Sequence, residues 1–126
     1  MKKERRNTLI QSFRYAFEGI WTGIRKERNM KIHCLAVIFV TLAGTLFQIT
    51  ASEWCICLLL FALVASLELV NTAVEAAVDL VTEEKKPLAK LAKDTAAGAV
   101  LFSAIVSVII GCIIFLPYLL ELAEKL

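Results

Sequence analysis

Three long, nearly uncharged apolar segments constrain the fold more than any other feature of the sequence. They cover about residues 30–49, 54–78 and 91–122. About 20 apolar residues suffice for a helix to cross a bilayer, whereas lipid cannot satisfy an open β-sheet edge. The hydrophobic content of 59% in 126 residues also exceeds what a small soluble domain can bury. We therefore expect a single all-α membrane domain, residues 1–126, with three transmembrane helices.

A shorter segment before the first span has a different pattern. Between Leu9 and Ile24, apolar residues recur at steps of three and four, and polar residues such as Arg14 and Glu18 lie between them. This spacing is typical of an amphipathic helix. We expect an N-terminal amphipathic helix over about residues 7–26 that lies on the membrane surface. The alternative is a helix that packs only on other parts of the protein.

The distribution of Lys and Arg predicts the orientation in the membrane. Nine of these residues precede or begin the first span, none lies in residues 48–53, and four lie in residues 82–93. Because cytoplasmic loops are enriched in Lys and Arg, we expect a multi-pass protein with a cytoplasmic N-terminus. The net charge of only +2 gives no indication of a nucleic-acid partner. The nine residues are Lys2, Lys3, Arg5, Arg6, Arg14, Arg25, Lys26, Arg28 and Lys31.

Four polar side chains share one face of the second span. They follow one another at steps of three, four and four: Glu68, Asn71, Glu75 and Asp79. A charged acid inside a span costs roughly 2.5–3.5 kcal/mol on insertion scales. The stripe therefore indicates a site for a cation, a basic side chain or a polar substrate. The alternative is a structural polar seam that holds the helices together.

Further charged residues are expected at the same membrane depth. They include Lys90, Lys93 and Asp94 at the start of the third span and Glu27 before the first. Carboxylates hold Mg²⁺ together with substrate phosphates, lysines neutralise phosphate oxygens, and a remaining carboxylate can accept a hydroxyl proton during phosphoryl transfer. This set favours an ATP-dependent kinase that acts on a lipid alcohol. The sequence has neither a P-loop nor a kinase glycine-rich loop, so the nucleotide site must have another design.

At these residues the sequence resembles a known family. The string Glu68-Leu-Val-Asn-Thr-Ala-Val-Glu-Ala-Ala-Val-Asp79, with Ala92-Lys93-Asp94 and Ala97-Gly98-Ala99-Val100 after it, is similar to the signature of the small bacterial integral-membrane lipid kinases, the diacylglycerol kinase and undecaprenol kinase family. The similarity covers nearly the whole chain. It implies a protein of the bacterial inner (plasma) membrane that uses Mg²⁺ and ATP and assembles as a homotrimer with sites between subunits.

The resemblance also implies roles for individual residues. Glu68 corresponds to the catalytic base that activates the lipid hydroxyl, and Asn71 to the polar residue beside it. Glu27 and Glu75 correspond to the carboxylates that hold the metal bound to ATP. The positions that correspond to nucleotide contacts are Tyr15, Asp79, Glu84, Lys93 and Asp94.

Two positions need a separate interpretation. Where the diacylglycerol kinases carry an arginine that faces ATP, this chain has Thr8, and the residues nearby that would replace the contact are Arg5, Arg6 and Arg14. His33 is the only histidine of the chain. We interpret it as a polar residue at the headgroup boundary rather than as a ligand or a base.

Small residues recur in the third span at a strict spacing of four. They are Ala99, Ser103, Ser107 and Gly111. Such a stripe lets helices approach closely, and it is compatible with the homotrimer that the resemblance implies. Gly19 and Gly23 have the same spacing, but they lie in the expected surface helix, so we give this pair little weight.

Together these features predict a membrane lipid kinase. Residues 27–33, 87–90 and 115–117 are more similar to the Gram-positive branch of the family, which implies transfer of the γ-phosphate of ATP to undecaprenol and formation of undecaprenyl phosphate, a lipid carrier of the cell envelope. One alternative is a diacylglycerol kinase that makes phosphatidic acid. An alternative of another class is a non-enzymatic, cation-conducting oligomer with Glu68 and Glu75 in its pore.

Overall fold

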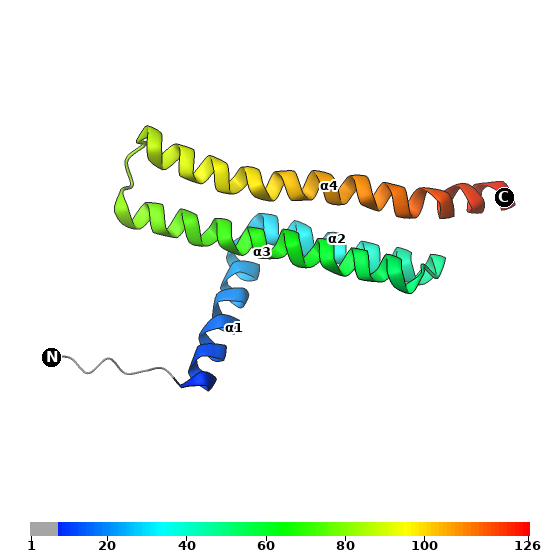
Figure 1. Ribbon diagram of the computed structural model, residues 1–126, viewed down its shortest axis with the longest axis horizontal. Helices are drawn as coiled ribbons and strands as arrows, with labels where there is room; N and C mark the ends of the chain where they lie inside the picture. Colours follow the sequence, from blue (N-terminus) through cyan, green and yellow to red (C-terminus); the bar gives the residue numbers. More distant parts are fainter. Residues whose placement is uncertain (1–7) are drawn as a thin grey trace.

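The computed structural model describes residues 8–126, and this range is helical apart from short connections (Figure 1). The helices are α1 (Leu9–Lys26), α2 (Arg28–Phe47), α3 (Ala51–Val81) and α4 (Pro87–Lys125). Helices α2, α3 and α4 are long and apolar enough to cross a membrane. The prediction of an all-α protein with three candidate spans is therefore confirmed. Lys2, Lys3, Arg5, Arg6 and residue 7 of the expected first helix lie outside the described residues.

Local sequence signals explain where the helices begin and end. Thr8 and Gln11 form a capping box at the start of α1, and Thr50 and Glu53 form one at the start of α3. In each pair, side chain and backbone exchange two hydrogen bonds that satisfy free N–H groups. Gln48 ends α2 in a left-handed conformation, with φ 53°. Thr8, where the family resemblance implies an arginine, thus has a structural role here.

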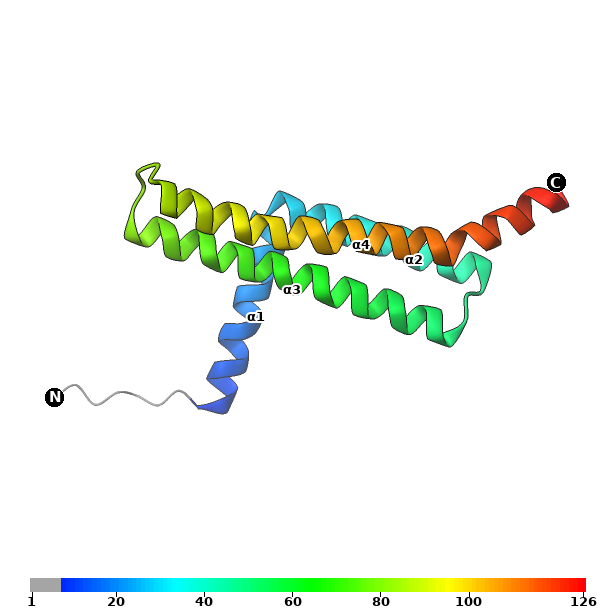
Figure 2. The same ribbon diagram turned by 45° about the horizontal axis from the view of Figure 1, so that its top comes forward.

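Helices α3 and α4 are longer than the apolar segments that predict them. Helix α3 continues to Val81, and α4 begins at Pro87 and ends at Lys125. The extensions are rich in Ala, Leu, Glu and Lys, which favour helix regardless of polarity, and a proline fits the first turn of a helix. A second proline, Pro117, lies inside α4, and the C-terminal part of α4 bends away from the bundle (Figure 2).

Helix α1 leaves the bundle of α2, α3 and α4 at a steep angle (Figures 1 and 2). The bend falls at Glu27, whose extended backbone separates α1 from α2. Helix α1 packs on α3 through Gly23, where an added Cβ would lie 2.5 Å from Cδ2 of Leu69. An added Cβ at Gly19 would meet nothing within 4 Å. Gly23 therefore permits the close approach, and it does so next to Glu68.

The helix lengths place the polar residues of α3 at different depths. Helix α2 has 20 residues and is about 30 Å long, which matches the hydrocarbon core of a bilayer. Helix α3 has 31 residues and is longer by about 16 Å. Because a short turn keeps the end of α2 level with the start of α3, the excess lies beyond the start of α2, where α1 crosses (Figure 1). Glu75 and Asp79 thus lie beyond the level at which α2 begins, whereas Glu68 lies within the length that α2 covers.

At the opposite end, aromatic side chains join the three long helices. The ring of Phe47 stacks on that of Tyr118, with centroids 5.8 Å apart. The Tyr118 hydroxyl donates a hydrogen bond of 2.6 Å to Oε2 of Glu53. An added Cβ at Gly44 would lie 2.7 Å from Cη2 of Trp54. These contacts fix α2 and α4 against the start of α3.

Candidate active site

Among the described residues, Glu68 is the one charged side chain that is fully buried. Its side chain on α3 is 1% exposed, and it lines a cavity of about 220 Å³ between α2, α3 and α4. Asn29, His33 and Asn71 add polar groups to the lining. The remaining lining residues are apolar: Ile32, Ala97, Val100, Leu101 and Ala104. The cavity thus combines an acid, two amides and an imidazole with apolar walls.

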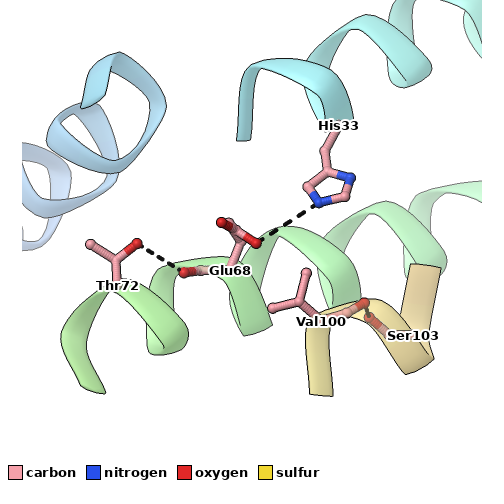
Figure 3. Close-up of polar contacts among 5 residues, drawn as sticks. All are labelled: His33, Glu68, Thr72, Val100 and Ser103. Carbon is pink, nitrogen blue, oxygen red and sulfur yellow. Dashed lines mark hydrogen bonds and ion pairs between the residues drawn. The ribbon is translucent and has the colours of Figure 1, made fainter. Parts of the chain in front are cut away.

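Four buried polar atoms at this cavity lack hydrogen-bond partners within the described chain. They are both carboxylate oxygens of Glu68, Oδ1 of Asn71 and Nε2 of His33. Nε2 of His33 lies 3.9 Å from Oε2 of Glu68, and Thr72 donates to the Glu68 backbone carbonyl rather than to the carboxylate (Figure 3). Buried polar groups without partners are costly. A carboxylate held in this state is available to a ligand.

A second, apolar cavity continues from the first. Its volume is about 360 Å³, and it extends along α2, α3 and α4 to Trp54 and Phe115. Ile32, His33 and Ala104 line both cavities. The two spaces therefore meet at His33, with the acid on one side and a lining suited to a hydrocarbon chain on the other. Ser107 and Gly111 of the small-residue stripe also line the apolar cavity, and Ser103 is buried, whereas Ala99 at the start of the stripe is exposed.

Charged residues continue along α3 and α4 beyond the cavity. Nζ of Lys93 on α4 lies 2.5 Å from Oδ1 of Asp79 on α3, which joins the two helices. Asp94 is paired with Lys90 one turn earlier on α4. The side chains of Lys93 and Asp79 are 39% and 55% exposed. This cluster is open to solvent and presents both signs of charge above the buried acid.

Glu27 and Glu75 lie within electrostatic range of Glu68. They come from the α1–α2 bend and from α3, two turns beyond Glu68. The described residues contain no group of three His, Cys, Asp or Glu side chains that could hold a metal ion. Mg²⁺, however, usually takes only one or two carboxylates and completes its shell with phosphates and water. The donor set of Glu27 and Glu75 fits that mode of binding.

Two of the predicted site residues do not join this arrangement in a single chain. Glu84 lies in the connection between α3 and α4, where its side chain is 80% exposed and 3.9 Å from Lys86. Tyr15 lies in the middle of α1 and is 53% exposed. Neither lines the cavity at Glu68. Both positions are open to a ligand or to another subunit.

His33 has a more central position than the sequence pattern indicated. We expected a polar residue at the headgroup boundary, but its side chain is only 18% exposed and faces Glu68. The available signal was the spacing of four from Asn29, which puts both on one face of α2. Both residues line the cavity. Only the packing of α2 on α3 determines that this face meets the acid.

Known proteins of one family are similar to this chain over most of its length. Residues 14–115 match the family described as prokaryotic diacylglycerol kinase. The chain is 48% identical to the undecaprenol kinase of Bacillus subtilis over 93% of this chain and 98% of that protein. It is 44% identical to a diacylglycerol kinase of Synechocystis over 90% of this chain and 66% of the relative. The identity to a diacylglycerol kinase of Haemophilus influenzae is 33%, over 85% and 92% of the two chains.

Proposed function

Because the chain belongs to the prokaryotic diacylglycerol kinase family, and is thus a lipid kinase, we propose that it transfers the γ-phosphate of ATP to the hydroxyl of undecaprenol at the cytoplasmic face of the inner membrane. The observation that carries this proposal is the buried, unpartnered Glu68 carboxylate where a polar cavity meets an apolar one. A lipid alcohol has the matching shape. Its tail fits the apolar cavity, and its hydroxyl reaches the acid.

The proposed reaction needs a base that takes the proton of the lipid hydroxyl and a side chain that holds this hydroxyl in position. The carboxylate of Glu68 takes the proton of the lipid hydroxyl while the hydroxyl oxygen attacks the γ-phosphorus in line. The bond from the γ-phosphorus to the bridging oxygen breaks, and ADP leaves. Oδ1 of Asn71, buried and without a partner, accepts a hydrogen bond from substrate and orients it. Burial keeps water, a competing acceptor, away from the γ-phosphate.

Mg²⁺ would be held by Glu27 and Glu75 together with the phosphates of ATP, where it offsets the charge on the transferred group. Lys93 contacts the phosphates from the open side, and Asp79 holds the lysine in place. Asp94 binds the nucleotide from the same end of α4. In this proposal the phosphates lie between the solvent-exposed cluster and the buried base.

Tyr15 and Glu84 complete the nucleotide site in a homotrimer. Within one chain neither residue lines the Glu68 cavity. Their proposed contacts to ATP therefore lie outside this cavity, where a neighbouring subunit can complete the site. Large apolar side chains on the outer faces, such as Phe39 and Phe102, at 73% and 72% exposed, provide surface for lipid and for other subunits. This exposure supports an assembly in the membrane.

Helix α1 is proposed to lie on the cytoplasmic surface of the membrane. Its apolar residues Leu9, Phe13 and Trp21 are 75%, 60% and 64% exposed, so the described chain leaves them uncovered. The steep angle between α1 and the bundle (Figure 1) suits a helix in the membrane plane when the bundle crosses the bilayer. Arg25 and Lys26 in its last turn favour the cytoplasmic side.

The experiment that tests the proposal compares two lipid alcohols. The purified protein is given ATP labelled on the γ-phosphate, Mg²⁺, and either undecaprenol or diacylglycerol in mixed micelles. We expect label in undecaprenyl phosphate, with a larger kcat/KM for undecaprenol, and a kcat at least about 100-fold lower for the Glu68→Gln variant. A larger kcat/KM for diacylglycerol would favour the second candidate, which the names of the Synechocystis and Haemophilus relatives support. Absence of label in both lipids would refute the kinase.

A further inference from the structure

The imidazole of His33 faces the buried acid from the neighbouring helix. Nε2 of His33 and Oε2 of Glu68 are 3.9 Å apart, and the side chains are 18% and 1% exposed (Figure 3). Neither atom has a hydrogen-bond partner within the described chain. A ring N–H donor and a carboxylate that face each other in a buried space, both unpartnered, are chemically complementary.

No other cationic side chain lines this space. Helix α4 contributes only apolar residues to the described lining of the cavity, and α3 adds Asn71. The nearby lysines of α4 are engaged elsewhere, since Lys93 pairs with Asp79 and Lys90 with Asp94. The acids in electrostatic range, Glu27 and Glu75, have the same sign of charge as Glu68. Among the described lining residues, the donors available to the base are therefore the imidazole of His33 and the neutral amides of Asn29 and Asn71, and only the imidazole is basic.

We propose that His33 is a positioning residue for Glu68: its Nε2–H donates a hydrogen bond to Oε2 and holds the other carboxylate oxygen toward the lipid hydroxyl. This inference rests on the proposed kinase function. Hydrogen bonds at active sites are often long without substrate and tighten in the complex, which accounts for the 3.9 Å separation. The balance of protons is simple. Glu68 receives the proton of the hydroxyl, and His33 keeps its own throughout.

The test replaces the donor in two ways. His33→Leu removes the N–H at similar volume, and His33→Gln places an amide N–H near the position of Nε2. We expect kcat of His33→Leu to fall by about 10- to 100-fold, the usual scale for a misplaced catalytic group, with the KM for ATP unchanged. His33→Gln should recover most of this loss. Cys34→Ala, next to it on α2 but outside both cavities, is the control and should match wild type.

A second measurement separates positioning from a structural role. If His33 acts through Glu68, then His33→Leu should reduce kcat no further in a Glu68→Gln background, because the carboxylate it holds is already absent. A fold-stabilising histidine would instead reduce the activity of both backgrounds by the same factor, and that result would overturn the inference. Equal kcat in His33→Leu and wild type would also overturn it. Inactive wild-type protein would refute the kinase function itself.

If His33→Leu does not fold, His33→Met supplies the same comparison with an unbranched side chain. The thermal midpoint of each variant in detergent identifies the properly folded ones. Equal activity of His33→Met and His33→Gln, both folded, would contradict the proposal. Activity in the Gln variant alone would support it.

Discussion

Gly23 of α1 lies so close to Leu69 of α3 that an added Cβ would be 2.5 Å from Cδ2 of the leucine. Leu69 follows Glu68 directly in the sequence. The contact therefore fixes α1 next to the residue that we propose as the base. It also holds the bend at Glu27, a proposed ligand of the metal, at the same level of the bundle.

Replacement of Gly23 by valine should lower both stability and activity. The added side chain forces α1 away from α3, and such overpacking costs about 1–3 kcal/mol. We expect a lower thermal midpoint in detergent and a kcat reduced by about tenfold or more, because Glu27 shifts with α1. Gly19→Val is the matched control, since an added Cβ there meets nothing within 4 Å. Equal effects of both substitutions would contradict the role of the contact.

The Glu68→Gln variant should separate activity from stability. Loss of a general base reduces turnover by about 100-fold or more. The free energy of unfolding should not fall, because glutamine removes a buried charge that has no hydrogen-bond partner in the described chain. Kinase assays and thermal unfolding in the same detergent measure the two effects. A variant that loses activity only in proportion to lost folded protein would mean that Glu68 is structural.

The role of the ion pair between Asp79 and Lys93 can be tested by exchanging the two charges. Both side chains are partly exposed, so the pair contributes at most about 1 kcal/mol to stability. Lys93→Gln should raise the KM for ATP at least tenfold with little change in the thermal midpoint. In the exchanged variant, Asp79→Lys with Lys93→Asp, the ion pair returns but the cation moves to the other helix. We expect the KM for ATP of the exchanged variant to remain high. If the ion pair were purely structural, the exchanged variant would regain the wild-type KM.

Much of the fold follows from hydropathy alone. The three apolar segments predicted the three long helices, because length and polarity limit what a chain can do in lipid. Helix α3 runs to Val81, one turn beyond the predicted apolar segment, because the charged Asp79 interrupts the apolar pattern but not the helix. The end of α3 lies beyond the start of α2 because the turn at Gln48 is tight, and this places Glu75 past the level at which α2 begins.

The candidate site was predictable in part. The helical period predicted that Glu68, Asn71, Glu75 and Asp79 share one face of α3, because residues of one helix face stay together whatever packs on them, and Glu68 and Asn71 line the cavity. The partnership of His33 with Glu68 was not predictable in this way. It joins two helices, and it depends on the rotation of α2 about its own axis. A single sequence does not show which face of α2 is turned toward α3.

Magnesium dependence should reveal the roles of Glu27 and Glu75. Glu75→Gln and Glu27→Gln each remove one carboxylate from the proposed metal site, so half-maximal activity should require at least tenfold more Mg²⁺. The variants should approach wild-type kcat more closely as Mg²⁺ rises. Glu83→Gln, in the exposed connection after α3, is the control. A reduced kcat that excess Mg²⁺ leaves unchanged would argue against metal binding by these residues.

The apolar cavity makes a prediction about the lipid substrate. Gly111 lines this cavity, and an added Cβ there meets nothing within 4 Å, so Gly111→Leu should fold normally while its side chain occupies space proposed for the lipid tail. We expect the KM for undecaprenol to rise about tenfold, on the scale of one to two lost apolar contacts, with the KM for ATP unchanged. Cys112→Leu, the next and more exposed residue, is the control. An unchanged KM for undecaprenol in Gly111→Leu would place the tail outside this cavity, on the lipid-facing surface of the helices.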